Sequence, residues 1–89
     1  MIVPTFTFNE EANGYLSEPF TIDKQVTVHI ELDSMAPVVV LKQEEDGEYD
    51  KYGQTPKETD MYELEITSNE QVTLILATPV GVRKCYIMN

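Results

Sequence analysis

Residues 25–32 read Gln-Val-Thr-Val-His-Ile-Glu-Leu, and this stretch decides the fold class. Every second residue in it is valine, isoleucine or leucine, and the residues between them are polar. A period of two is typical of a β-strand with one buried and one solvated face. Four aliphatic side chains on one face need an apolar partner surface, which later segments of the chain are suited to supply.

The remaining chain consists largely of segments with the same character. Alternating or continuous apolar residues predict further strands at 2–8, 38–43, 49–52, 60–67, 71–78 and 82–88, with a short one at Phe20 and Ile22. The apolar runs within 38–41 and 71–78 indicate strands that are covered on both faces.

Turn residues separate these segments. Asn13-Gly14 and Asp46-Gly47 are typical turn and hairpin dipeptides. Residues 23–24 are expected to turn into the strand at 25–32, and residues 33–37 to turn out of it. Pro4 has no N–H to donate, so the first strand should lie at a sheet edge or begin pairing after Pro4.

No segment shows a helical period, and about seven short strands with frequent turns predict an all-β protein. We expect an antiparallel β-sandwich of the immunoglobulin-like or jelly-roll kind, with a small barrel as the alternative. The 89 residues are expected to form one domain, residues 1–89, in which residues 1–8 are a strand or a docking arm.

The charge is strongly acidic. Sixteen acids and six bases give a formal net charge of −10. This excess argues against direct binding to nucleic acid or to an anionic membrane, since both depend on Lys and Arg. We expect no signal peptide and no transmembrane segment, because the chain lacks a basic region before an apolar run and lacks a run of about 20 apolar residues.

His29 and Cys85 are the single histidine and the single cysteine, so no intramolecular disulfide can form. Paired with a nucleophile or an acid, a histidine could act as a general base. Neither residue has a catalytic motif around it, and we expect a surface histidine and a buried structural thiol. The sequence therefore predicts a protein that is not an enzyme.

An acidic loop follows the strand at 38–43. Asp46, Glu48 and Asp50 have the spacing of the first three ligands of a calcium loop. Lys51 and Lys57 stand where that motif needs glycine and glutamate, so only a non-standard calcium site remains as an alternative. No cluster of Cys and His suits zinc, and we expect no cofactor.

Residues 44–65 hold nine acids. These acids either form a solvated rim that prevents edge-to-edge pairing, or mimic the phosphate track of a nucleic acid. Tyr49 and Tyr52 lie in or beside the same loop and are candidates for a surface on which sugars stack.

Four segments carry a resemblance to a known group of proteins: Val38-Val39-Val40-Leu41, Asp46-Gly47-Glu48-Tyr49, Tyr62-Glu63-Leu64-Glu65-Ile66 and Val82-Arg83-Lys84-Cys85-Tyr86-Ile87. Their layout resembles that of small β-sandwich proteins of tailed-phage virions. Such proteins serve as capsid decoration proteins, head fibres and tail accessories. The resemblance implies a protein that is bound in a symmetric assembly. It implies no site residues, because those families share an architecture rather than a site.

We therefore expect a non-enzymatic structural or interaction module of a phage virion, assembled in the host cytoplasm. Its partner would be a capsid or other virion protein, and it would form a homo-oligomer or symmetric assembly. The alternatives are an acidic nucleic-acid mimic that inhibits a host enzyme and a small carbohydrate-binding module. The expected partner-binding residues are Ile2, Val3, Phe6, Phe8, Glu44, Glu45, Asp46, Glu48, Tyr49, Asp50 and Tyr52.

Overall fold

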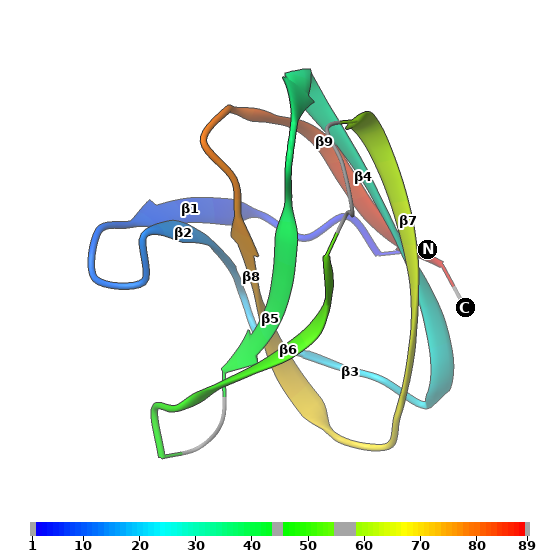
Figure 1. Ribbon diagram of the computed structural model, residues 1–89. Coiled ribbons are helices and arrows are strands. Elements are labelled where there is room, and N and C mark those ends of the chain that lie inside the picture. Colours follow the sequence, from blue (N-terminus) through cyan, green and yellow to red (C-terminus); the bar gives the residue numbers. More distant parts are fainter. Residues whose placement is uncertain (1, 44–45, 55–58, 89) are drawn as a thin grey trace.

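The computed structural model describes residues 2–43, 46–54 and 59–88. These residues form strands and no helix, so the described chain has no helix that could cross a membrane. The strands are β1 Phe6–Asn9, β2 Gly14–Ser17, β3 Phe20–Thr21, β4 Lys24–Ala36, β5 Val39–Gln43, β6 Tyr49–Gln54, β7 Thr59–Ser68, β8 Gln71–Ala77 and β9 Val82–Met88. They make two antiparallel sheets that pack into a β-sandwich, as the sequence predicts (Figure 1).

The smaller sheet has the order β7-β4-β9 and contains the stretch that decides the fold. Val28 and Ile30 are fully buried in the core, as the alternation predicts. On β7 the matching inward residue Ile66 is buried, and on β9 Ile87 is buried. The inward residues of β4 therefore pack directly against the other sheet.

The larger sheet has the order β1-β2-β8-β5-β6, and β3 pairs with one end of β8. Leu74 and Leu76 of β8 point into the core, whereas Ile75 lies on the outer face and is nevertheless 1% exposed. Leu16 and Leu41 stand beside Ile75 on β2 and β5 and cover it. The prediction that β8 is buried on both faces is thus confirmed.

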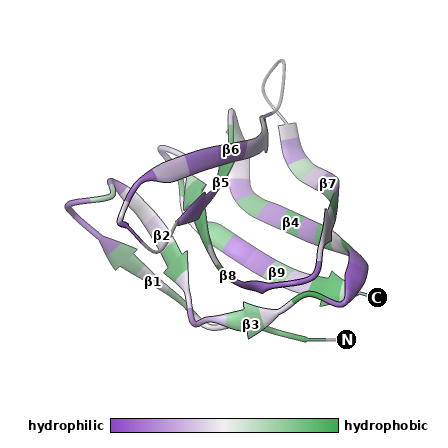
Figure 2. Cartoon of the chain, turned by 90° about the horizontal axis from the view of Figure 1, so that it is seen from below, coloured by the Kyte–Doolittle hydropathy of each residue, from purple (hydrophilic) through white to green (hydrophobic). Residues whose placement is uncertain are grey.

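The edge strand β6 differs from the central strands in composition. Along most strands in Figure 2, green hydrophobic and purple hydrophilic positions alternate, which reflects one buried and one solvated face. β6 is drawn almost entirely in hydrophilic colours, in keeping with its place at the edge of the larger sheet. It pairs with β5 as a hairpin, as the sequence predicts.

The N-terminal segment crosses from one sheet to the other. Ile2 exchanges two backbone hydrogen bonds with Ile87 of β9, at 2.8 and 2.7 Å. Four residues later the same segment becomes β1, which pairs with β2 in the larger sheet. Pro4 lies between the two pairings, and its missing N–H explains why the pairing with β9 stops there.

The turn that the sequence predicts at residues 33–37 is wrong, because the strand β4 extends through most of this stretch. β4 continues to Ala36, which pairs with Thr59 after a shift in register and is 3% exposed. Asp33 takes part in this extension, since its N–H donates to Gly81 O at 2.9 Å. Tertiary pairing with β7 and the segment before β9 therefore keeps polar residues in a strand.

The dipeptides Asn13-Gly14 and Asp46-Gly47 both lie where the chain reverses, as predicted, although Gly14–Ser17, for which no strand is predicted, forms β2. Gly47 has a φ of 88°, as the Asp46-Gly47 turn requires. At the other turn Asn13 takes the left-handed conformation, with a φ of 52°. Gly14 is needed for a different reason: a Cβ there would lie 2.9 Å from Leu76 O.

Lys24 forms the turn into β4. Its φ of 74° and the hydrogen bond from Gln25 N to Asp23 O, at 3.1 Å, define a γ-turn. Lys24 N also donates to Asn69 Oδ1 at 3.0 Å, which ties the start of β4 to the turn before β8. The polar turn expected at residues 23–24 is thus confirmed.

Candidate interaction surfaces

A polar cluster covers the middle of β4 on the outer face of the smaller sheet. The register places Glu63 of β7 and Tyr86 of β9 on either side of His29. The His29 ring stacks on Tyr86 with 4.5 Å between ring centroids. Its Nδ1 lies 2.9 Å from Glu63 Oε2, and its Nε2 lies 2.8 Å from Glu31 Oε2. Arg83 Nη2 donates to the second oxygen of Glu31 at 3.0 Å.

This arrangement favours the protonated form of His29. A neutral imidazole has one N–H, so both carboxylate contacts are hydrogen bonds only when the ring is a doubly protonated imidazolium. The hydrogen bond with Glu63 raises the pKa of His29, against the opposing effect of burial, and Glu31 raises it further. The hydrogen bonds with His29 and then Arg83 lower the pKa of Glu31. We call these five residues, Glu31, His29, Glu63, Arg83 and Tyr86, the histidine clamp.

The expectation of a surface histidine is wrong, since His29 is 6% exposed. It lies on the outward face, but neighbouring side chains from β4, β7 and β9 cover it. The expectation of a buried thiol is confirmed: Cys85 points into the core, and burial raises its pKa to about 12. Because His29 and Cys85 lie on opposite faces of the sheet, they do not form a nucleophile and base pair.

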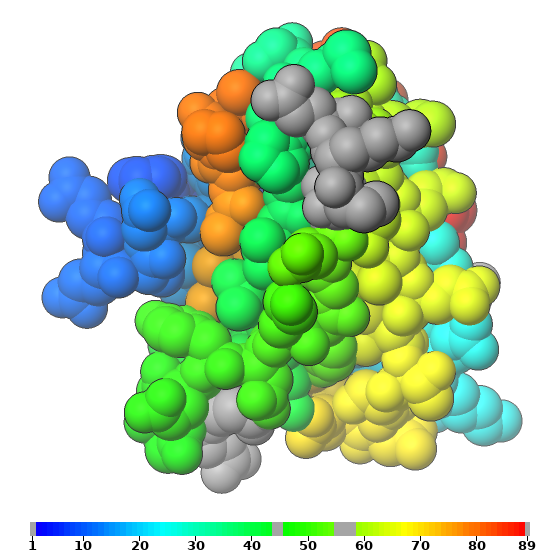
Figure 3. All heavy atoms as spheres, in the orientation of Figure 1, coloured from blue at the N-terminus to red at the C-terminus, as the bar shows by residue number. Residues whose placement is uncertain are grey.

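The expected N-terminal binding residues lie at two different places. Phe6 is half-buried against the core, whereas Phe8 is 51% exposed and meets Tyr15 edge to face, at 5.4 Å between centroids. Ile2 and Val3 are also exposed, at 39% and 66%, but lie on the β9 side. In Figure 3 the β1–β2 hairpin, in blue, projects from the body of the molecule.

A cleft of about 310 Å³ opens between the N-terminal segment and β9. Its lining is mostly apolar, with two bases beside it, and consists of Val3, Pro4, Phe6, Tyr15, Val82, Arg83, Lys84 and Cys85. Pro4 explains the opening, because the register that joins Ile2 to Ile87 would bring Pro4 opposite Cys85, where it has no N–H to donate. We call this opening the β9 cleft.

The acidic loop lies at the opposite edge of the larger sheet from β1. Asp46, Glu48, Tyr49 and Asp50 are exposed there, and the Glu48 N–H donates to Asp46 Oδ1 at 2.9 Å. Glu44 and Glu45, which were expected in the same surface, lie outside the described residues. Nowhere in the described chain do three His, Cys, Asp or Glu side chains meet in a group that could hold a metal ion.

The two tyrosines of this hairpin differ. Tyr49 is 45% exposed, but Tyr52 is half-buried and packs against the core. A register shift between Val40 and Leu41 makes Tyr52 the extra residue on its strand. The pair therefore does not offer the exposed two-ring surface that sugar stacking requires, and we do not propose carbohydrate binding.

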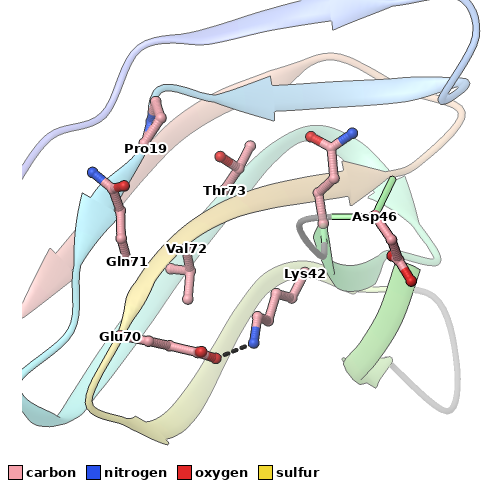
Figure 4. A pocket seen from close by; sticks show the side chains of 8 residues that line it. Pro19, Lys42, Asp46, Glu70, Gln71, Val72 and Thr73 are labelled. Atoms are coloured by element: carbon pink, nitrogen blue, oxygen red, sulfur yellow. Dashed lines mark hydrogen bonds and ion pairs between the residues drawn. The ribbon is translucent and has the colours of Figure 1, made fainter. Parts of the chain in front are cut away.

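A larger open groove of about 830 Å³ lies where β5, β8 and the β2–β3 connection meet. Figure 4 shows Lys42 and Glu70 reaching toward one another as an ion pair, with Thr73 and Gln71 nearby. The groove also contains Pro19, Val72 and Asp46. The residues that line this groove do not place a nucleophile beside a general base. Their composition is that of an ordinary solvated surface.

Comparison with known protein families, with curated proteins and with solved structures finds no match to this chain. The interpretation of its surfaces therefore depends on their own geometry. The sequence contains one visible sign of the histidine clamp, the placement of Glu31 two residues after His29 on the same face. The contributions of Glu63 and Tyr86 depend on strand register, which local alternation does not reveal.

Proposed function

We propose that this protein is a non-enzymatic interaction module that works through protein contacts within a symmetric assembly, as a component of a phage virion. The observation that carries this proposal is the half-exposed Phe8 on an uncharged edge strand of a projecting hairpin. A large aromatic side chain held outside the core at a strand edge is the kind of anchor that protein partners bury.

The outermost strands of the two sheet orders are β1, β6, β7 and β9, and the last three carry features that hinder pairing with another chain over all or part of their length. β6 has a bulge and carries Asp50 and Lys51, and β7 carries three acids. Part of β9 is paired with Ile2. β1 has no charged residue and no bulge, so it lacks the usual devices against edge-to-edge association apart from its short length. A strand of this kind is suited to docking on a partner.

The virion setting is supported by the resemblance of residues 38–87 to small β-sandwich proteins of tailed phages. The exposed apolar side chains also support a binding role, because they lie on strand edges and a hairpin rather than in an enclosed cavity with converging polar groups. Exposed apolar surfaces of this kind contribute to binding when a partner protein buries them.

A photo-crosslink tests this proposal. The full chain carries p-benzoylphenylalanine in place of Phe8, or in place of exposed Glu48 as a control, in cells that produce phage particles. The expected result is that purified, illuminated particles contain the chain joined at position 8 to a structural protein, with little product from position 48. Particles that lack the chain, or equal products at both positions, would contradict the proposal.

A nucleic-acid mimic is the second candidate function, and one observation favours it. Asp46, Glu48 and Asp50 are all exposed on one hairpin, where their charges can face a basic groove. In that case inhibition of a nuclease would weaken steeply with salt. Reversing the charges of Glu44, Glu45, Asp46, Glu48 and Asp50 together would abolish inhibition; retained inhibition would exclude this function.

A further inference from the structure

The two edges of the smaller sheet carry opposite charges. β7 contains Asp60, Glu63 and Glu65 and no base, whereas β9 contains Arg83 and Lys84 and no acid. β4 lies between them, so the acidic edge and the basic edge face away from each other. In a protein with a net charge of −10, β9 is the edge at which an acidic partner meets the least repulsion.

On the β9 side, the bases stand beside the apolar β9 cleft. Arg83 is held by Glu31. Exposed Lys84 lies opposite Glu31 in the register of β4 and β9, without an ion pair to any residue that the structure describes. The N–H and C=O of Ile87 point away from β4 and bond to Ile2. Cys85 lies two residues earlier on β9, so its N–H and C=O point to the same side of the strand. The cleft therefore combines a largely apolar interior with an exposed lysine and the backbone groups of Cys85.

On the β7 side, one apolar side chain stands out among acids. Met61 is 56% exposed, with Asp60 next to it in the chain and Glu63 next on the same face. Thr59 Oγ1 accepts from Met61 N at 3.2 Å and donates to Met61 O at 2.8 Å. The backbone at Met61 is thus occupied locally, so this edge would contact a partner through side chains rather than by adding a strand.

We propose that the β9 cleft of one copy binds the β7 edge of a second copy, with Met61 entering the cleft and the acids along β7, Asp60 and Glu65, facing the basic side of β9. Met61 is an exposed apolar side chain, and the β9 cleft is an opening of about 310 Å³ that could receive it. The acids of β7 and the bases of β9 have opposite charges. Two different patches meet in this contact, so it is heterologous and builds a ring when the rotation between copies closes. The inference rests on the proposed symmetric assembly but not on the hairpin that carries Phe8.

The experiment measures self-association of the full chain by sedimentation velocity over a range of concentrations. Three proteins are compared with the wild type: Lys84→Glu, the double variant Asp60→Lys with Glu65→Lys, and Lys51→Glu as a control on exposed β6. Circular dichroism checks that each variant is folded. Because all four positions are exposed or at a strand edge, the substitutions leave the core intact.

The expected result is that the wild type and Lys51→Glu form an oligomer, whereas Lys84→Glu and the double variant each associate at least about tenfold more weakly. An equimolar mixture of these two weakened proteins should assemble again, because the acidic cleft of one meets the basic edge of the other. A monomeric wild type, an unchanged oligomer of Lys84→Glu, or a mixture that stays monomeric would overturn the inference. The crosslink from position 8 is a separate outcome, so the proposed function can stand if this contact fails.

Discussion

The two sheets differ in how the outward-facing side chains of their central strands are buried. On the larger sheet the outward Ile75 of β8 is buried under Leu16 and Leu41. On the smaller sheet the outward His29 of β4 is buried under Tyr86 and two carboxylates. One cover is apolar and the other is a charged network, although both strands occupy the middle of their sheets.

This difference implies different sensitivities. Apolar burial depends on the area removed from water and is nearly independent of pH. The histidine clamp depends on a proton, because a neutral ring leaves one of its two carboxylates facing a nitrogen lone pair. The outer face of the smaller sheet should therefore respond to pH where the outer face of the larger sheet does not.

The largest expected effect comes from the apolar cover. Ile75→Ala should lower the free energy of unfolding by about 2–4 kcal/mol, since it removes buried methyl groups and leaves a cavity between Leu16 and Leu41. Urea denaturation at about pH 6 and about pH 9 should give the same loss at both values. A loss that differs strongly between them would show that this face also depends on charge.

The clamp should contribute less. His29→Gln removes the imidazolium from between Glu31 and Glu63, and should cost about 1–2 kcal/mol at about pH 6. The cost should shrink as the pH rises toward about 9 and passes the raised pKa of folded His29, because the wild-type ring then loses its proton. Urea denaturation of both proteins at the two pH values measures this; an equal cost at both would refute a protonated clamp.

The wild type should lose stability when the pH rises above neutral. The pKa of folded His29 is raised above its ordinary value of 6.5, so folding takes up protons, and the stabilisation is complete below 6.5 and disappears as the pH passes the raised folded value. The pKa of Glu31 is lowered from 4.5, so its contribution is complete above 4.5 and disappears as the pH falls through the lowered folded value. Thermal denaturation across pH should show this loss on the alkaline side, and His29→Gln should flatten it.

The smallest expected change separates the two carboxylates on β7. Glu63→Gln should lower the pKa of His29 toward its ordinary value, because Glu63 is the main cause of the raised pKa. Glu65→Gln is the matched control, since Glu65 lies on the same face of β7 but opposite Thr27. An NMR titration of the imidazole protons measures both. Equal shifts in the two variants would mean that general surface charge, not the clamp, raises the pKa.

The sequence predicts the sandwich and most strand positions because burial alternates with the pleat. The sequence predicts strands at 82–88 and 71–78, and β9 and β8 lie there to within a residue. The hairpin at Asp46-Gly47 also follows from local chemistry, because a turn glycine with a positive φ is needed there.

Most features that the sequence does not predict depend on pairing between distant segments. The burial of His29 requires the register that brings Glu63 and Tyr86 beside it. The extension of β4 to Ala36 requires Thr59 on the neighbouring strand. Among the expected binding residues, Phe8 on β1 is exposed, whereas Tyr52 is half-buried and occupies a bulge in the β5–β6 pair.

The pairing of Ile2 with Ile87 has a consequence for how the protein is made. A ribosome synthesises residues 82–88 last among the described strands, yet β4 and the N-terminal segment both need them as partners. Until that stretch leaves the exit tunnel, the apolar face of β4 lacks β9, and the early part of the chain has only some of its contacts. The smaller sheet can therefore close only after translation has passed β9, so during synthesis the nascent chain depends on the β1–β2 hairpin and other local pairs.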